Sequence, residues 1–229
     1  VLLAQRQQRI PLKGERVVLA GHSMGALTAL VASGQTPQNG MDQRCRKALV
    51  DLPLTNLSRL LQCELAERGV LQPRSATVSP AAVVGLNSLG SVIWPVGSSE
   101  PSLMPLLLVG GTLDLITPPL DEQIGLLASL GQHPSSRVVV IEGASHFSPI
   151  RVGEFQVGTR EDDLFQLGED LVGVNPLSVQ RVIAHEIVVF LSSLSATSVV
   201  SVDEHWSDGD VRWHRLTVEG ARTLYRRYQ

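Results

Sequence analysis

The sequence predicts an α/β protein in which helices cover both faces of a mostly parallel sheet. Four short apolar runs are bounded by Gly, Pro or charged residues, and continuous apolarity is typical of strands buried on both faces. Segments with helical periodicity lie between and after these runs, and alternating strands and helices are the signature of the α/β class. With 43% hydrophobic residues, the 229-residue chain can bury a sizeable core. The predicted strands are 16–20, 81–86, 105–109 and 137–141.

The helical segments carry start and stop signals. The segment 118–130 has Thr117 as its expected N-cap, Pro118 at the first helical position and Gly131 at its end. A longer helix opens at Asn175, and its apolar residues recur with the spacing of one helix face. The predicted helices are 24–33, 118–130, one from Asn175 to about Leu194, and a short one near 218–227.

Composition and charge exclude several classes of protein. The 19 Lys and Arg against 22 Asp and Glu give a net charge of −3, whereas a nucleic-acid-binding domain shows a clustered basic excess. Two cysteines are too few for a disulfide-rich scaffold, and no Cys-x-x-Cys pair predicts a zinc site. The longest uncharged stretch, 75–99, has prolines, glycines and serines that disfavour a membrane span, and no signal-peptide pattern opens the chain. We therefore expect a soluble globular protein, cytoplasmic or exported.

Residues 21–25 read Gly-His-Ser-Met-Gly, a G-x-S-x-G pattern, at the junction of the first strand and the first helix. A sharp turn here lifts the Ser23 hydroxyl above the sheet edge, and the flanking glycines leave room for its unusual backbone angles. The start of the helix offers backbone N–H groups, that of Met24 among them, to a developing oxyanion. The pattern predicts Ser23 as a nucleophile. The alternative is a glycine-rich strand–helix turn in another kind of α/β protein.

A serine nucleophile needs a base, and the base needs an acid to hold it. Asp114 lies just past the third predicted strand and His146 just past the fourth. Because parallel strands end at the same edge of a sheet, both side chains are expected beside Ser23, in the chain order Ser, acid, His. We therefore predict Ser23, Asp114 and His146 as a catalytic triad.

Other acids and histidines fit these roles less well. Glu142 could replace the acid, but it lies at the end of the fourth strand beside the histidine itself. Asp121 and Glu122 are interpreted as first-turn residues that complement a helix dipole. His22, inside the turn, is expected to point away from the nucleophile as a structural residue. The remaining histidines, His133, His185, His205 and His214, lack a place at a strand end.

With these residues in hand, the chain resembles the α/β-hydrolase superfamily, and within it the predicted dienelactone hydrolases related to platelet-activating-factor acetylhydrolase. The resemblance implies an α/β-hydrolase fold, with the nucleophile at Ser23, the acid at Asp114 and the base at His146. It also implies hydrolysis of a small-molecule carboxylic ester or similar acyl bond, with no metal or other cofactor. The pieces that carry it are GHSMGALTAL at 21–30, NLSRLLQCEL at 56–65, AAVVGLNSLGS at 81–91, PLLLVGGTLDLITPPLDEQI at 105–124 and VIEGASHFS at 140–148.

The chain departs from the family pattern around the nucleophile. Family members usually carry a second glycine after the turn, where this chain has Ala26, and several strands before it, whereas only 22 residues precede Ser23. The loop that gives the second oxyanion donor normally lies in that earlier part, and losing one donor costs roughly 10²–10³ in kcat. We therefore expect a chain that starts inside a longer product, lacks the N-terminal strands and is by itself a weak or inactive esterase. Dienelactone hydrolases in the strict sense use a cysteine nucleophile, so the family name does not give the substrate.

Two parts of the chain fall outside the alternation of strands and helices. We interpret residues 1–195 as the C-terminal portion of a hydrolase domain, with a lid-like segment at 147–174 that includes an acidic group at 161–170. Residues 196–229, with Trp206 and Trp213, are interpreted as a C-terminal extension of unassigned role.

The pocket and the reaction partner stay open at this stage. Trp94 and Phe147 are candidates for lining an acyl pocket, as are Phe155 and Phe165, with core packing as the alternative for each. Rival functions are acyl transfer, in which an alcohol replaces water, and a non-catalytic binding protein on the same fold. The sequence indicates neither the acyl length nor the oligomeric state.

The two cysteines lie in the excursion after the first helix, far from the other strand-end residues. We predict that Cys45 and Cys63 are structural rather than catalytic, and they could form a disulfide if the protein is exported.

Overall fold

A computed structural model describes residues 16–50, 56–69, 79–97, 100–102, 104–150, 173–195 and 202–228. Within these ranges six strands form one mixed sheet, in the order β1-β2-β3-β4-β6-β5. Strands β1 to β4 run parallel, and β6 is antiparallel to both β4 and β5. The predicted α/β class is confirmed. The strands are β1 Val18–His22, β2 Ala82–Leu86, β3 Leu106–Gly111, β4 Arg137–Ile141, β5 Glu204–Asp208 and β6 Val211–Thr217.

All four predicted strands are present, with shifts of one or two residues at some of their ends. Their continuous apolarity has a simple cause in β3. Leu106 and Leu108 pack into the core on one face of the sheet, and Leu107 and Val109 pack into the core on the other. Because both faces are covered, neither set of side chains needs to be polar.

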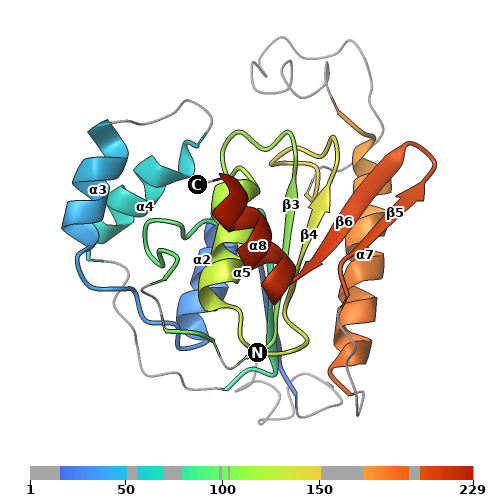
Figure 1. Ribbon diagram of the computed structural model, residues 1–229, viewed down its shortest axis with the longest axis horizontal. Helices are drawn as coiled ribbons and strands as arrows, with labels where there is room; N and C mark the ends of the chain where they lie inside the picture. Colours follow the sequence, from blue (N-terminus) through green and yellow to red (C-terminus); the bar gives the residue numbers. More distant parts are fainter. Residues whose placement is uncertain are drawn as a thin grey trace, which may run out of the picture.

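Helices lie on both faces of the sheet (Figure 1). Helices α2, α5 and α8 share one hydrophobic cluster with the sheet, and α7 packs against the opposite face. The predicted start of α7 is confirmed, because the Asn175 side chain accepts a hydrogen bond from the Leu177 N–H and Pro176 is the first helical residue. The helices are α2 Met24–Ala32, α3 Met41–Val50, α4 Ser58–Glu67, the π-helix η1 Leu120–Ile124, α5 Gly125–Leu130, α7 Pro176–Ser193 and α8 Val218–Tyr228.

The helix predicted over 118–130 is wrong at its beginning. The segment opens with the π-helix η1, in which the Ile124 N–H donates to the Pro119 carbonyl at 2.7 Å, and continues as α5. Thr117 is not an N-cap. Its hydroxyl donates instead to the carboxylate of Asp114, which lies three residues earlier in the same loop.

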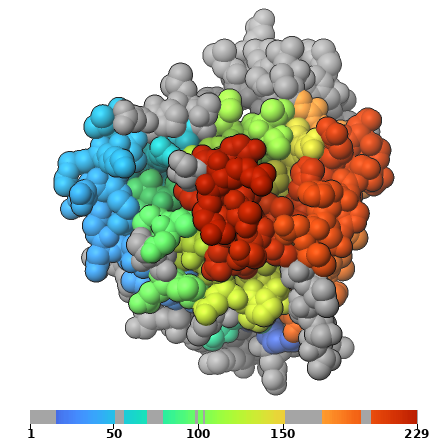
Figure 2. Space-filling view, viewed as in Figure 1, coloured from blue at the N-terminus to red at the C-terminus, as the bar shows by residue number. Residues whose placement is uncertain are grey.

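The C-terminal segment, to which the sequence assigns no role, is part of the sheet. The β5–β6 hairpin adds two strands beyond β4, with Trp206 and Trp213 stacked on it at 6.0 Å between ring centroids. Helix α8 then crosses to α5, where Arg222 donates to the Gly131 carbonyl at 2.8 Å. In Figure 2, α8 (dark red) covers the front of the molecule next to the hairpin (orange-red).

A disulfide joins Cys45 of α3 to Cys63 of α4, with 5.5 Å between the Cα atoms. The residue before each cysteine holds the same loop after β2. Arg44 donates to the Val92 carbonyl at 2.7 Å, and the Gln62 side-chain oxygen accepts from the Val92 N–H at 2.8 Å. Both helices of this pair, α3 and α4, are therefore attached to the loop after β2.

The central part of the lid-like segment, 151–172, with Phe155, Phe165 and the acidic group, lies outside the described residues. Of the helices in the described ranges, none has the length and apolarity needed to cross a membrane.

Candidate active site

Ser23 forms the turn between β1 and α2, with φ 53° and ψ −120°. A positive φ is uncommon and strained for a residue other than glycine, and such strain clusters at functional sites. The Ser23 N–H donates to the Leu86 carbonyl of β2 at 2.8 Å, which fixes the turn against the neighbouring strand.

Only one of the two glycines that flank Ser23 is required by close packing. A Cβ at Gly21 would lie 2.1 Å from the backbone carbon and oxygen of Gly25, so α2 could not approach β1 with any other residue there. A Cβ at Gly25 would meet nothing within 4 Å. The sequence pattern is thus explained at its first glycine and not at its second.

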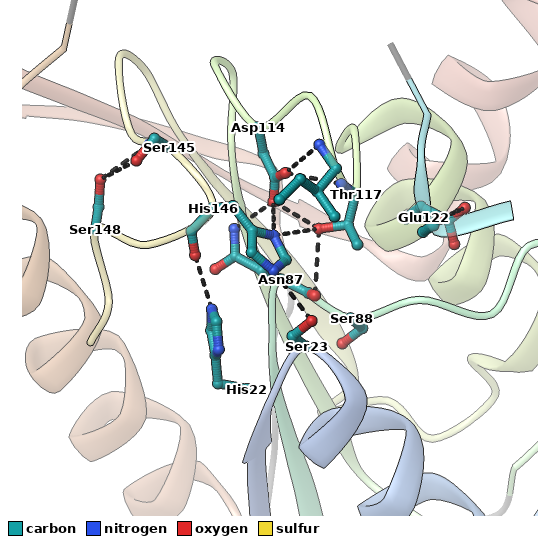
Figure 3. Close-up of polar contacts among 12 residues, drawn as sticks. His22, Ser23, Asn87, Ser88, Asp114, Thr117, Glu122, Ser145, His146 and Ser148 are labelled. Carbon is teal, nitrogen blue, oxygen red and sulfur yellow. Dashed lines mark hydrogen bonds and ion pairs between the residues drawn. The ribbon is translucent and has the colours of Figure 1, made fainter. Parts of the chain in front are cut away.

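The structure brings Ser23, His146 and Asp114 together at the carboxyl edge of the parallel strands (Figure 3). His146 Nε2 lies 3.0 Å from Ser23 Oγ, and His146 Nδ1 lies 2.9 Å from Asp114 Oδ2. Asp114 is 1% exposed and His146 is 5% exposed. Because the carboxylate accepts from Nδ1, the neutral imidazole carries its proton there, and Nε2 is left to accept the serine proton.

Asp114 is surrounded by donors that sequence reasoning missed. Its Oδ1 accepts from the backbone N–H groups of Ile116 at 2.9 Å and Thr117 at 2.7 Å. Its Oδ2 accepts from the Asn87 side-chain amide at 2.6 Å and from the Thr117 hydroxyl at 2.5 Å. The Ile116 and Thr117 contacts are local to the loop, since an Asp side chain commonly accepts from the N–H groups two and three residues later. For Asn87 the sequence signal is its position directly after β2, at the same sheet edge.

The pKa of Asp114 lies below its ordinary value. Burial alone would raise this pKa, but the hydrogen bond and charge of His146 lower it, and so do the side-chain and backbone hydrogen bonds of Thr117. The structure thus keeps Asp114 ionised next to the imidazole.

His22 supports the loop that carries His146. Its Nε2 donates to the His146 carbonyl at 2.7 Å, and the two ring centroids are 4.9 Å apart. Burial lowers the pKa of His22, although its hydrogen bond to the His146 carbonyl acts in the opposite direction. A neutral His22 with its proton on Nε2 is therefore the form that fits this contact.

Met24 is the first residue of α2, so its backbone N–H has no acceptor inside the helix. This N–H directly follows the Ser23 turn, at the helix end that attracts negative charge. The oxyanion role of the Met24 N–H stays a prediction.

The competing acids are engaged elsewhere. Glu142 accepts from His214 at 2.7 Å and pairs with Arg212 at 2.6 Å. Glu122 lies in the first turn of η1, as expected, and it is fully buried there. Its carboxylate accepts from the side chains of Asn56, Ser58, Gln62 and Ser91 and from the backbone of Gly90 and Ser91.

The two candidate pocket residues have different places. Trp94 is 1% exposed, packs in the core and donates from Nε1 to the Thr36 carbonyl at 2.9 Å, so the core-packing alternative describes it better than an acyl pocket. Phe147 is 37% exposed and stands edge-on to the His146 ring at 5.1 Å. Phe147 is therefore the one that adjoins the site.

No protein-family model matches this chain. A search of curated proteins finds no match either. In the described ranges, no three His, Cys, Asp or Glu side chains are grouped so that they could hold a metal ion. The function must therefore be inferred from the geometry of Ser23, His146 and Asp114.

Proposed function

We propose that the protein is a serine hydrolase of the α/β-hydrolase type that cleaves a carboxylic ester or related acyl bond through an acyl-enzyme. The observation that carries this proposal is the hydrogen-bonded chain from Ser23 Oγ through His146 to Asp114, at 3.0 Å and 2.9 Å. A serine at a strained strand–helix turn, a neutral imidazole and a buried carboxylate are the parts that nucleophilic acyl transfer requires.

In the first half-reaction, Ser23 Oγ attacks the ester carbonyl while His146 Nε2 takes the hydroxyl proton. The negative charge that develops on the carbonyl oxygen is stabilised by the Met24 N–H at the start of α2. The ester C–O bond then breaks, His146 returns the proton to the leaving alkoxide, and an acyl-Ser23 ester and a free alcohol result.

In the second half-reaction, a water molecule attacks the acyl carbonyl while His146 takes one of its protons. Breakage of the acyl–Ser23 bond releases the carboxylic acid, and the proton returns to Ser23 Oγ. In both steps Asp114 orients the imidazole and stabilises its protonated form. An alcohol in the place of water would make the same chemistry an acyl transfer.

Labelling with a fluorophosphonate probe tests the proposal. We expect covalent modification of Ser23 in the wild type, none in Ser23→Ala, and normal labelling in Ser33→Ala, a matched control at the far end of α2. A folded wild type that takes up no probe, or a Ser23→Ala variant that is still labelled, contradicts the proposal.

A product assay with a short-chain nitrophenyl ester, with and without added alcohol, separates the two acyl acceptors. Free acid as the main product supports hydrolysis, and a new ester as the main product supports acyl transfer. If the wild type bound the fluorophosphonate probe without forming a covalent bond, the result would support the rival function of a non-catalytic binding protein.

A further inference from the structure

Two side chains outside the predicted triad converge on the oxygen of Asp114 that faces the imidazole. The Asn87 amide nitrogen lies 2.6 Å from Asp114 Oδ2, and Thr117 Oγ1 lies 2.5 Å from the same atom (Figure 3). Asn87 is 1% exposed and Thr117 is fully buried. Neither side chain has solvent as an alternative partner, so each hydrogen bond replaces a lost contact with water.

The direction of each hydrogen bond follows from the proton count. The amide nitrogen of Asn87 can only donate, and the Asp114 carboxylate can only accept. The Thr117 hydroxyl has one proton and three acceptor-capable neighbours, namely Asp114 Oδ2 at 2.5 Å, the Asn87 carbonyl at 3.2 Å and His146 Nδ1 at 3.2 Å. The shortest and charged acceptor takes that proton, so the hydroxyl oxygen faces the Nδ1–H of the imidazole.

Asp114 Oδ2 thus accepts from three side chains, while Oδ1 accepts from two backbone N–H groups. A carboxylate offers about four lone-pair positions, so these five donors saturate it. Rotation of the carboxylate, or its protonation, would break several of these bonds. The group is therefore held in one charge state and one orientation.

The backbone at Asn87 is built for this contact. Its φ is 46°, a conformation that asparagine adopts more readily than most residues. Its N–H donates to the Val109 carbonyl of β3 at 2.7 Å, and the preceding Leu86 carbonyl accepts from Ser23. The end of β2 therefore contacts the Ser23 turn on one side and the Asp114 loop on the other.

We propose that Asn87 and Thr117 are positioning residues of the Ser23–His146–Asp114 site, which hold Asp114 ionised with Oδ2 directed at the imidazole. This inference rests on the proposed function, since it assigns the two residues a part in the same reaction. Of the described titratable groups, His146 from the loop after β4 and His22 from β1 face this carboxylate, so both must be followed in a pH experiment.

Two pairs of variants test the inference. Thr117→Val removes the hydroxyl and keeps the shape, whereas Thr117→Ser keeps the hydroxyl. Asn87→Gly removes the amide and tolerates a φ of 46°. Ser88→Ala is the matched control for Asn87→Gly. Ser88 directly follows Asn87 and is also buried, but its hydroxyl has no hydrogen-bond partner in the described part of the structure.

We expect Thr117→Val and Asn87→Gly each to lower kcat by roughly tenfold to a hundredfold, the range for one hydrogen bond to a charged group, with KM nearly unchanged. The acid limb of their pH–rate profiles should move to higher pH, because a carboxylate with fewer donors holds the protonated imidazole more strongly. Thr117→Ser and Ser88→Ala should keep the wild-type kcat and profile. A purely structural role would reduce the folded fraction without moving the acid limb.

Titration of the His146 Cε1 resonance by NMR, with His22 resolved beside it, provides a readout that needs no turnover. An upward shift of the His146 midpoint in Thr117→Val and Asn87→Gly supports the inference, even if the wild type hydrolyses no ester and the proposed function fails. Unchanged His146 midpoints together with wild-type kcat overturn it. So does a lower kcat with an unmoved acid limb.

Discussion

Asp114 and Glu122 are two buried carboxylates in the same stretch of chain, and their surroundings differ in one respect. Both are almost without exposure, and both accept from several donors. Every donor to Glu122 is neutral, whereas Asp114 also binds the imidazole of His146, which in turn contacts Ser23. Burial and hydrogen bonding are therefore found both at a structural carboxylate and at a carboxylate of the candidate active site. The feature that distinguishes Asp114 is an ionisable partner, His146, which itself contacts a nucleophile.

The replacement Asp114→Asn should have the strongest effect on the rate of catalysis. The new amide presents N–H groups to His146 Nδ1, which favours the wrong imidazole tautomer, and kcat should fall by roughly 10³–10⁴. The rate is measured on the folded fraction with a nitrophenyl ester. A kcat within tenfold of the wild type would contradict the role proposed for Asp114.

Glu122→Gln is the matched change at the other carboxylate. It turns an acceptor for several donors into a group that is itself partly a donor, so the free energy of unfolding should fall by about 3–4 kcal/mol. Urea unfolding measures this loss. The kcat of the folded fraction should stay at the wild-type value, and a large fall in kcat would place Glu122 in the site.

The double variant Cys45→Ser, Cys63→Ser tests whether the disulfide between α3 and α4 has a structural role only. The disulfide joins residues 18 positions apart, and its removal should lower the free energy of unfolding by about 3 kcal/mol. Mass spectrometry without reduction verifies the bond in the wild type. Equal rates of ester hydrolysis at a temperature where both forms are folded are the expected outcome.

The smallest expected effect is a difference in acid sensitivity. Because the pKa of Asp114 is lowered in the folded state, its stabilising contribution is complete above the ordinary Asp pKa, about 3.9, and is lost as the pH falls through the folded value. The free energy of unfolding should therefore fall more steeply below about pH 4 in the wild type than in Asp114→Asn. Parallel curves would show that Asp114 does not contribute in this way.

Much of the proposed site follows from local patterns in the sequence. The apolar runs mark where strands end, and parallel strands end at a common edge, so the sequence alone is enough to place Ser23, Asp114 and His146 near one another. No local pattern shows which partners a side chain finds across the sheet. The helix cap predicted at Thr117 is wrong for a local reason, because Asp114, three residues earlier in the same loop, is a charged acceptor and takes the Thr117 hydroxyl proton.

The other differences arise from packing between segments that are distant in the sequence. Glu122 has the sequence position of a first-turn acid, and the packing of α4 and of the loop after β2 buries it and supplies its hydrogen-bond donors. The β5–β6 hairpin pairs with β4 across the long intervening helix α7, and strand pairing over such a separation leaves no periodic signal at short range. Strand ends are thus predictable from the sequence, and the contacts made by the side chains beyond them are not.

The position of β6 in the sheet has a consequence for how the chain is made. Synthesis delivers β1 to β4 in sheet order, but the strand that covers the outer edge of β4 emerges only after α7 and β5. Until then β4, whose end leads directly to His146, has a row of unsatisfied backbone groups beside apolar residues, a surface that recruits other nascent chains. The sheet beside the histidine loop is therefore completed late, and between the emergence of β4 and that of β6 the nascent chain exposes an unpaired strand edge that is prone to aggregation.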